Sequence, residues 1–145
     1  MVRRRLVTIV VIACAAAGVL AYLRDPPWLI GRSSGLRGWE QQPGGPRYRW
    51  SGGHASFFVR SDAGEIAFPI STTFDGHDSR PMTVTVSVDD RPVGRTVLAG
   101  PAWAAVRIAL PPPGGRSVRR IDVRTSVTRE GNRGVRIGEV ESVRR

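Results

Sequence analysis

The sequence contains no lysine, so all 22 of its basic residues are arginine. A formal net charge of +10 suggests a nucleic-acid ligand at first sight. Nucleic-acid-binding proteins, however, gather their basic residues into a patch or stripe, often with aromatic residues between them. Here the arginines are scattered singly, and the densest interior run is Arg119-Arg120, followed by Arg124. We therefore expect no nucleic-acid partner, and a positive surface facing anionic lipid or an acidic envelope polymer agrees better with the pattern.

Cysteine and histidine are almost as scarce. The one cysteine, Cys14, lies in the apolar N-terminal run, which excludes a disulfide framework and a cysteine-based metal cluster from the rest of the chain. Of the two histidines, His54 lies near Ser51 and Ser56, which suggests a nucleophile with its base. Adjacent strand positions point to opposite faces, and no Gly-x-Ser-x-Gly or other nucleophile motif is present. We therefore expect no enzymatic activity, no catalytic residue and no cofactor.

The N-terminus has the pattern of a membrane anchor. It begins MVRRR and continues with an uncharged run over residues 6–23, which as a helix spans about 27 Å. Pro26 and Pro27 prevent the helix from continuing. The basic residues before the run place the N-terminus in the cytoplasm by the positive-inside rule. We expect residues 1–24 to be a signal anchor, with the membrane contacted through residues 6–23 and the remaining chain outside.

Two other interpretations of this segment stay open. Residues 13–15 and 15–17 both satisfy the small-x-small rule of a cleaved signal peptide. Residues 11–14 resemble a lipobox, which would make Cys14 a lipidated residue. The apolar residues that continue past every possible cleavage point favour the uncleaved anchor, and all three interpretations place the folded part outside the cytoplasm.

The rest of the chain has the period of β-strands. Residues 25–46 are rich in proline and glycine and are expected to be a linker that leads into the domain, which spans residues 47–145. Alternation of apolar and polar residues then marks strands with one buried face. The clearest case is the set Met82, Val84, Val86 and Val88, and the other strands are expected near 47–51, 54–60, 66–70, 93–98, 103–110, 121–127 and 135–143.

Turn-forming residues separate these strands at the spacing of a sandwich or barrel. Asp89-Asp90 marks the tightest hairpin, PPPGG at 111–115 ends another strand, and Gly138 suggests a bulge in the last one. No segment after residue 24 shows a helical period. The sequence therefore predicts an all-β fold, an antiparallel two-sheet sandwich of about eight strands that is jelly-roll-like, preceded by one transmembrane helix.

Three stretches carry a resemblance to a known family. They are TVTVSVDDRPVGRTVL followed by GPAWAAVRIALPPP, the opening RGWE…YRWSGGHASFFV, and the closing NRGVRIGEVESV. Together they resemble a bacterial jelly-roll β-sandwich module that is similar to carbohydrate-binding modules and is found appended to membrane glycosyltransferases and other envelope proteins. The resemblance covers about residues 37–143. Where relatives usually carry Asp-Gly in the central hairpin, this chain has Asp89-Asp90.

Aromatic residues are the candidate ligand contacts, because sugar rings pack their C–H faces on exposed aromatic rings. Trp39, Tyr48 and Trp103, together with His54, form the candidate ligand-binding set. Tryptophan also fills sandwich cores, and we expect Trp50 to do so.

Acidic residues give a weaker candidate. Jelly-roll carbohydrate-binding modules often hold a structural calcium ion, and Asp75 and Asp78 supply two of the oxygen ligands such an ion needs. These residues are also the usual components of a solvated turn, and we expect no bound metal. Glu139 and Glu141 lie near the C-terminus and are expected to be solvated.

Two functions follow as hypotheses. The first is a non-catalytic, membrane-anchored module outside a bacterial cytoplasmic membrane that binds glycan or supports an envelope glycan-handling enzyme. The second is a protein–protein interaction module that assembles with another membrane or envelope protein and binds no sugar. Exposed aromatic rings beside polar groups on a concave face favour the first, and an exposed apolar patch favours the second.

Overall fold

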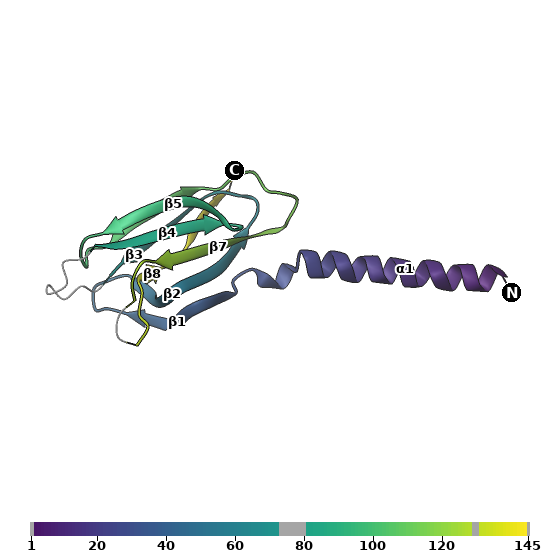
Figure 1. Ribbon diagram of the computed structural model, residues 1–145, viewed down its shortest axis with the longest axis horizontal. Helices are drawn as coiled ribbons and strands as arrows, with labels where there is room; N and C mark the ends of the chain where they lie inside the picture. The colour runs from purple at the N-terminus through teal and green to yellow at the C-terminus, as the bar shows by residue number, and fades with distance from the viewer. Residues whose placement is uncertain (1, 73–80, 129–130, 145) are drawn as a thin grey trace.

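A computed structural model of the chain describes residues 2–72, 81–128 and 131–144, and consists of an N-terminal helix followed by a β-sandwich (Figure 1). Helix α1, Val2–Arg24, projects from one end of the sandwich, and a short 3-10 helix, η1, Pro27–Leu29, connects the two. The helix from Arg5 to Arg24 is exposed and is long and apolar enough to cross a membrane, a property that it shares with signal sequences.

All other elements of the described residues are strands, most of them where the alternating pattern predicts them. Their bounds are β1 Ser33–Gln41, β2 Arg47–Arg60, β3 Ala63–Ser71, β4 Met82–Val88, β5 Arg91–Leu98, β6 Ala104–Ala109, β7 Val118–Thr125, β8 Arg136–Gly138 and β9 Glu141–Arg144. The predicted antiparallel sandwich behind one apolar N-terminal helix is confirmed, with nine strands in the described residues instead of about eight.

The nine strands form two layers. One layer has the order β5-β4-β7-β2 with β1 on the free edge of β2, and the other contains β6 and β3 with β9 on the second edge of β3. Strand β8 pairs with both β2 and β3, so the hydrogen bonding runs continuously from one layer to the other and the sheet is curled. Beyond β8, the chain leaves β2 and continues along β3 as β9.

The core lies between these layers. On β4 the four residues Met82, Val84, Val86 and Val88 are at most 1% exposed while their neighbours are half-buried, which confirms the predicted buried face. They pack with apolar residues of the other strands, among them Phe57, Phe68, Ile121 and Ile137. Trp50, predicted to fill the core, is 5% exposed.

The hairpin between β4 and β5 has two aspartates in a turn that usually contains glycine. Asp89 and Asp90 have φ values of 48° and 69°, the left-handed pair that a tight two-residue hairpin requires and glycine usually supplies. Both carboxylates find partners on β7: Asp89 accepts a hydrogen bond from the backbone N–H of Arg120 at 2.9 Å and pairs with the guanidinium of Arg119, and Asp90 pairs with Arg120. These contacts offset the strain of non-glycine residues with positive φ.

Three boundaries differ from the sequence-based prediction. The expected linker 25–46 contains β1, because this irregular segment is held as a strand by its pairing with β2. The two strands expected at 47–51 and 54–60 are one strand, β2, and its pairing with β1 shifts register on both sides of Leu36. The last strand is divided into β8 and β9. A Cβ atom on Gly138 would lie 2.3 Å from Cγ of Pro69, so glycine permits the close approach of β3 at this point.

The helix defines two ends of the sandwich. The end that we call helix-proximal contains the loop 111–117 and the turn after Arg60; there the backbone N–H of Ser117 donates to the Asp25 carboxylate at 2.8 Å. This hydrogen bond, with others from the same loop, holds the pKa of Asp25 below its usual value. The opposite, helix-distal end contains the end of β1 and the start of β2 (Figure 1).

Candidate binding groove

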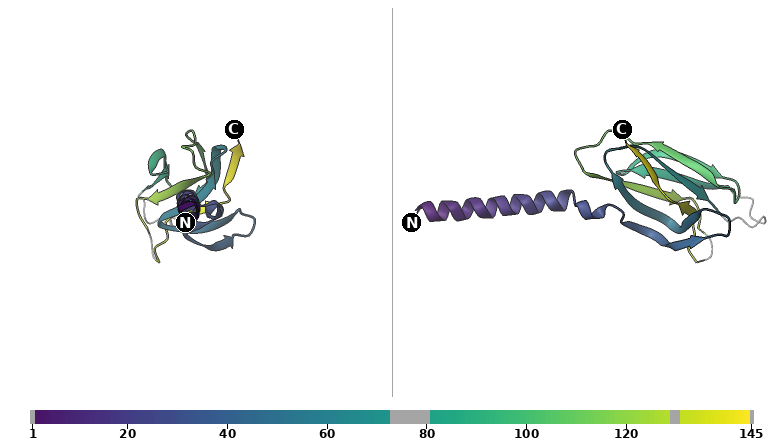
Figure 2. Two further views of the ribbon diagram at one scale, coloured as in Figure 1. Left: turned by 90° about the vertical axis from the view of Figure 1, so that its right-hand side faces the viewer. Right: turned by 180° about the vertical axis from the view of Figure 1, so that it is seen from behind.

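A groove with a volume of about 500 Å³ opens on the side of the sandwich that carries the two edge strands β1 and β9. Seen along the helix, β1 in dark blue and β9 in yellow lie on the same side of the molecule (Figure 2, left). The groove is lined by residues 30–33, 36 and 39 of the first wall, 49 and 57–60 of β2, and 137–140 and 142 of the second wall. A volume of this size is in the range of small-molecule sites.

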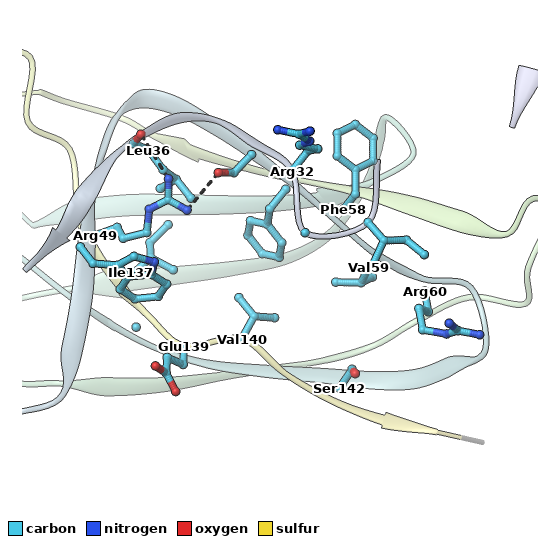
Figure 3. A pocket seen from close by; sticks show the side chains of 16 residues that line it. Arg32, Leu36, Arg49, Phe58, Val59, Arg60, Ile137, Glu139, Val140 and Ser142 are labelled. Atoms are coloured by element: carbon cyan, nitrogen blue, oxygen red, sulfur yellow. Dashed lines mark hydrogen bonds between the residues drawn. The ribbon is translucent and has the colours of Figure 1, made fainter. Parts of the chain in front are cut away.

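The floor of this groove is apolar. Phe57, Val59 and Ile137 belong to the buried core, and Leu36 and Val140 are partly buried side chains that pack against it. Val140 lies on the chain segment that joins β8 to β9 (Figure 3). The groove therefore reaches the hydrophobic core through a gap between the two layers.

Arg49 of β2 lies against the first wall of the groove. Its guanidinium donates to the carbonyl oxygen of Arg37 at 2.8 Å and to Oγ of Ser33 at 3.0 Å, with a longer contact to the carbonyl oxygen of Leu36 at 3.5 Å, so it ties β2 to β1 (Figure 3). Among the ion pairs formed by the described residues, none gives Arg49 a carboxylate partner. Within the described residues, the printed contacts of its guanidinium are with neutral oxygens of β1 and with the Trp39 ring.

Trp39 stands at the helix-distal mouth of the groove. It is 41% exposed, and it lies on β1 directly opposite Arg49. The guanidinium carbons of Arg47 and Arg49 lie 4.7 and 5.4 Å from the centroid of its ring, within the range of cation–π contacts. Glu139, which is exposed, lines the same part of the groove. An exposed indole, a guanidinium and a carboxylate thus line one end of an apolar groove (Figure 3).

The other two aromatic candidates lie together in a separate cluster. Tyr48 is 8% exposed, packs edge-on against Trp50 with centroids 6.1 Å apart, and lies 5.9 Å from Trp103. Arg136 places its guanidinium 4.9 Å from the Trp103 centroid and 5.4 Å from that of Tyr48. Because a sugar platform needs an open ring face, Tyr48 supports this cluster from within and is not a platform itself.

Arg136 is the most deeply buried charge of the cluster, with 5% of its surface exposed. It donates to Oγ of Ser71 at 2.6 Å, to Oε1 of Gln42 at 3.1 Å and to the carbonyl oxygen of Pro101 at 3.3 Å. Its Nε has no hydrogen-bond partner among the described atoms. Aromatic faces and neutral oxygens therefore stabilise this charge, and Arg136 of β8 in turn joins the 99–103 loop, through Pro101, to Ser71 of β3.

His54 lies in a third place, on the outer face of β2. Its Nε2 is 2.9 Å from Oδ1 of Asp122 and 3.4 Å from Oγ of Ser56, and Ser56 donates to the same Oδ1 at 2.6 Å. His54 and Ser56 therefore share a face, since they are two positions apart on one strand. A serine-hydrolase triad needs the carboxylate on one ring nitrogen and the hydroxyl on the other. Here both contact Nε2, and serine and aspartate bond each other directly, so the arrangement is a structural network.

The Asp122 carboxylate holds this network together. Burial alone would raise the pKa of Asp122, but hydrogen bonds from Ser56, His54 and Arg120, with the positive charge of Arg120, lower it below its usual value. Arg120 donates to Oδ2 of Asp122 at 3.0 Å and, in return, the carboxylate raises the pKa of the guanidinium. The ionised form of Asp122 is therefore favoured in the folded protein.

The remaining predicted residues lie elsewhere. Cys14 is exposed on α1. Asp75 and Asp78, the proposed calcium ligands, lie outside the described residues. Within the described ranges, no three or more His, Cys, Asp or Glu side chains lie close enough to hold a metal ion.

Sequence reasoning missed Arg49 and Glu139, which line the groove together with Trp39, and missed the buried Arg136. Arg49 has a signal in the sequence, since it shares β2 with Tyr48 and Trp50 but points to the other face. Glu139 has no such signal in the sequence, because only the pairing of β8 with β2 brings it to the groove.

Comparison with known proteins identifies similar folds but no family for this chain. No family model matches the chain, and no curated protein matches it. Among solved structures, the salicylyl-acyltransferase SsfX3 from a tetracycline biosynthetic pathway has a TM-score of 0.50 at 14% identity, over 78% of this chain and 36% of that one. A family 35 carbohydrate-binding module from Clostridium thermocellum has a TM-score of 0.48 at 12% identity, over 79% of this chain and 92% of the module.

A family two carbohydrate esterase from the same organism, solved with cellohexaose, has a TM-score of 0.49 at 13% identity over 76% of this chain. The chain spans only 30% of that esterase. At these identities the likeness concerns the fold. The protein is a curled β-sandwich, and of these three structures the acyltransferase, at a TM-score of 0.50, shares that fold over 78% of this chain.

Proposed function

We propose that this protein is a membrane-anchored, non-catalytic module that binds a glycan outside the cytoplasmic membrane of a bacterium. The observation that carries the proposal is the groove beside Trp39. A sugar ring gains from stacking on an exposed indole and from hydrogen bonds to charged groups at its rim. Trp39, Arg49 and Glu139 supply these groups at one mouth of a groove of about 500 Å³.

The anchor in this proposal is α1. Its apolar part is exposed along its whole length and has three arginines before it, which favours a cytoplasmic N-terminus. Residues 1–24 then form the anchor, residues 25–32 a short connection, and the sandwich from Ser33 onward lies outside. Mass spectrometry of the mature N-terminus tests this part: an intact Met1 supports the anchor, and a start at Cys14 or later contradicts it.

A second function is favoured by a different feature of the same groove. Strand β1 has a free edge in the described part of the chain, and the groove floor is apolar. Extended peptides add to such edges through main-chain hydrogen bonds and place side chains in neighbouring pockets. A protein partner that adds a strand to β1 is therefore the alternative occupant.

One experiment separates the two functions. The full-length chain in phosphatidylcholine nanodiscs is applied to an array of bacterial envelope polysaccharides and oligosaccharides. Glycan binding that is lost in Trp39→Ala and kept in Trp28→Ala, where another exposed tryptophan lies outside the groove, supports the proposal. An array without binding, together with a protein partner whose binding protects the edge of β1, would favour the alternative.

A further inference from the structure

The polarity of the side chains that line the groove changes along its length. At the helix-distal mouth it carries an aromatic ring and two charged side chains, Trp39, Arg49 and Glu139. In Figure 3, Arg49 and Glu139 lie at one end of the groove and Arg60 at the other. Apart from Arg32, Ser33 and Ser142, the rest of the lining is largely apolar: Leu36 lies at the Arg49 end, and Val140 and Val59 lie between Arg49 and Arg60 (Figure 3).

The apolar part begins where the chain leaves the helix. Ile30, which is 42% exposed, lines the groove only six positions after Arg24, the last residue of α1. Asp25 is held on the loop 111–117 by the backbone N–H of Ser117, which fixes the helix end to this side of the sandwich. In the anchored protein, the apolar part of the groove therefore faces the membrane and the Trp39 mouth faces away from it.

A free polysaccharide does not account for this arrangement. Its surface is covered with hydroxyl groups, and burying them against Leu36 or Val140 without hydrogen bonds is unfavourable. An alkyl chain, in contrast, gains about 0.8 kcal/mol for each methylene group that it buries. The groove thus matches a ligand with a polar head and an apolar tail, and the direction of the groove places the tail on the membrane side.

We propose that the groove binds a glycolipid, with the sugar head against Trp39 and Arg49 and the first part of the lipid chain over Leu36, Val59 and Val140. The proposal rests on the glycan-binding function proposed above and narrows its ligand to a glycan that is still attached to a membrane lipid. The exposed Arg32 and Arg60 stand at the membrane-side end of the groove, where anionic headgroup phosphates attract basic side chains.

Photo-crosslinking in a bilayer tests the proposal. The full-length chain is placed in phosphatidylcholine nanodiscs that contain a glucosyl diacylglycerol with a diazirine in its acyl chain. A second sample contains phosphatidylcholine with the same photoreactive chain. We expect the glycolipid to label peptides of β1 and of the 137–142 segment about tenfold more than the phospholipid does. Both lipids should label α1 equally, which serves as the internal standard.

Variants locate the site. Val140→Arg places a charge in the apolar part and should abolish labelling of the groove, whereas Val97→Arg, at a 56% exposed valine of β5 outside the groove, should not change it. Trp39→Ala should reduce labelling by the glycolipid only. Because Val140→Arg could disturb folding, its near-ultraviolet circular dichroism is compared with that of the Val97→Arg protein, and Leu36→Asn provides a second, smaller change.

The outcomes separate this inference from the proposed function. Labelling confined to α1 with both lipids, or equal labelling of the groove by both, overturns the glycolipid inference. If the glycan array is positive in that case, the protein binds free glycan and the proposed function stands. If the array is negative and both lipids label the groove equally, both proposals are wrong, and the groove binds membrane lipid whatever its headgroup.

Discussion

The guanidinium of Arg49 lies 5.4 Å from the centroid of the Trp39 ring, and the two residues are direct partners across the β1–β2 pair. The same side chain hydrogen-bonds to Ser33 and to two backbone carbonyl groups of β1. One arginine therefore positions the tryptophan and fastens the edge strand that carries it. The wall of the groove is in this way preformed, which lowers the entropic cost of binding.

Replacing Arg49 by alanine should loosen β1 without unfolding the sandwich. The change removes the hydrogen bonds to residues 33–37, each of which contributes about 1 kcal/mol, while the core strands keep their packing. Hydrogen exchange of the β1 amides should become about tenfold faster, and exchange of β4 and β7 should not change. Arg95→Ala, at an exposed residue of β5, is the control. Equal exchange rates for β1 in both variants would contradict the role of Arg49.

Trp50 and Trp39 should differ in how much each contributes to the free energy of unfolding. Trp50 is 5% exposed and packs against Tyr48, so Trp50→Ala should lower the free energy of unfolding by about 3–5 kcal/mol. Trp39 is 41% exposed, and Trp39→Ala should cost only about 1 kcal/mol, the strength of its contacts with the arginines. Urea titration followed by circular dichroism measures both values. Similar losses in the two variants would mean that Trp39 belongs to the core and not to a binding site.

Gly138 should be intolerant of even a methyl group. A Cβ atom there meets the ring of Pro69 at 2.3 Å, and Pro69 cannot rotate away because its ring belongs to the backbone of β3. Gly138→Ala should destabilise the fold by about 1–3 kcal/mol. Gly100→Ala is the matched control, since a methyl group there would meet no atom within 4 Å beyond its chain neighbours. Thermal midpoints that fall by the same amount in both variants would show that the close approach of β3 and β8 is not tight.

Asp122 should account for part of the stability that the folded protein loses in acid. Its pKa in the folded state lies below that in the unfolded chain, where an aspartate titrates near about 3.9. The ionised carboxylate therefore stabilises the fold above that pH, and the contribution is lost as the pH falls through the lowered folded-state pKa. Asp122→Asn should be less stable than the wild type at pH 7 and should lose less stability on acidification. Parallel pH profiles of the thermal midpoint for the two proteins would exclude this contribution.

Much of the fold could be predicted because its strands bury one face. Met82 to Val88 alternate so regularly that only a half-buried strand fits, and the structure places all four apolar residues in the core. Strand β1 gives no such signal. Its sequence, SSGLRGWEQ, is mostly exposed and contains two glycines, and it is a strand because β2 offers an open edge. A conformation that comes from tertiary pairing cannot be read from the segment itself.

The groove was only partly predictable for a related reason. Trp39 could be recognised as a candidate because it lies in a segment rich in glycine and polar residues, without the apolar neighbours that would bury it. Its neighbours could not be named, since Glu139 reaches the groove through the path of β8 along β2 and β3. Tyr48 and Trp103 share the aromatic character of Trp39, but the strand register turns Tyr48 into the Arg136 cluster, away from the groove.

Glycan binding at Trp39 is the central claim, and a direct affinity measurement tests it. The full-length chain and its Trp39→Ala variant are titrated in nanodiscs with the oligosaccharides that give the strongest array signals. We expect binding by the wild type that is weakened about tenfold or more in the variant, with unchanged secondary structure by circular dichroism. Equal affinities in the two proteins, or no binding to any envelope glycan, would contradict the account.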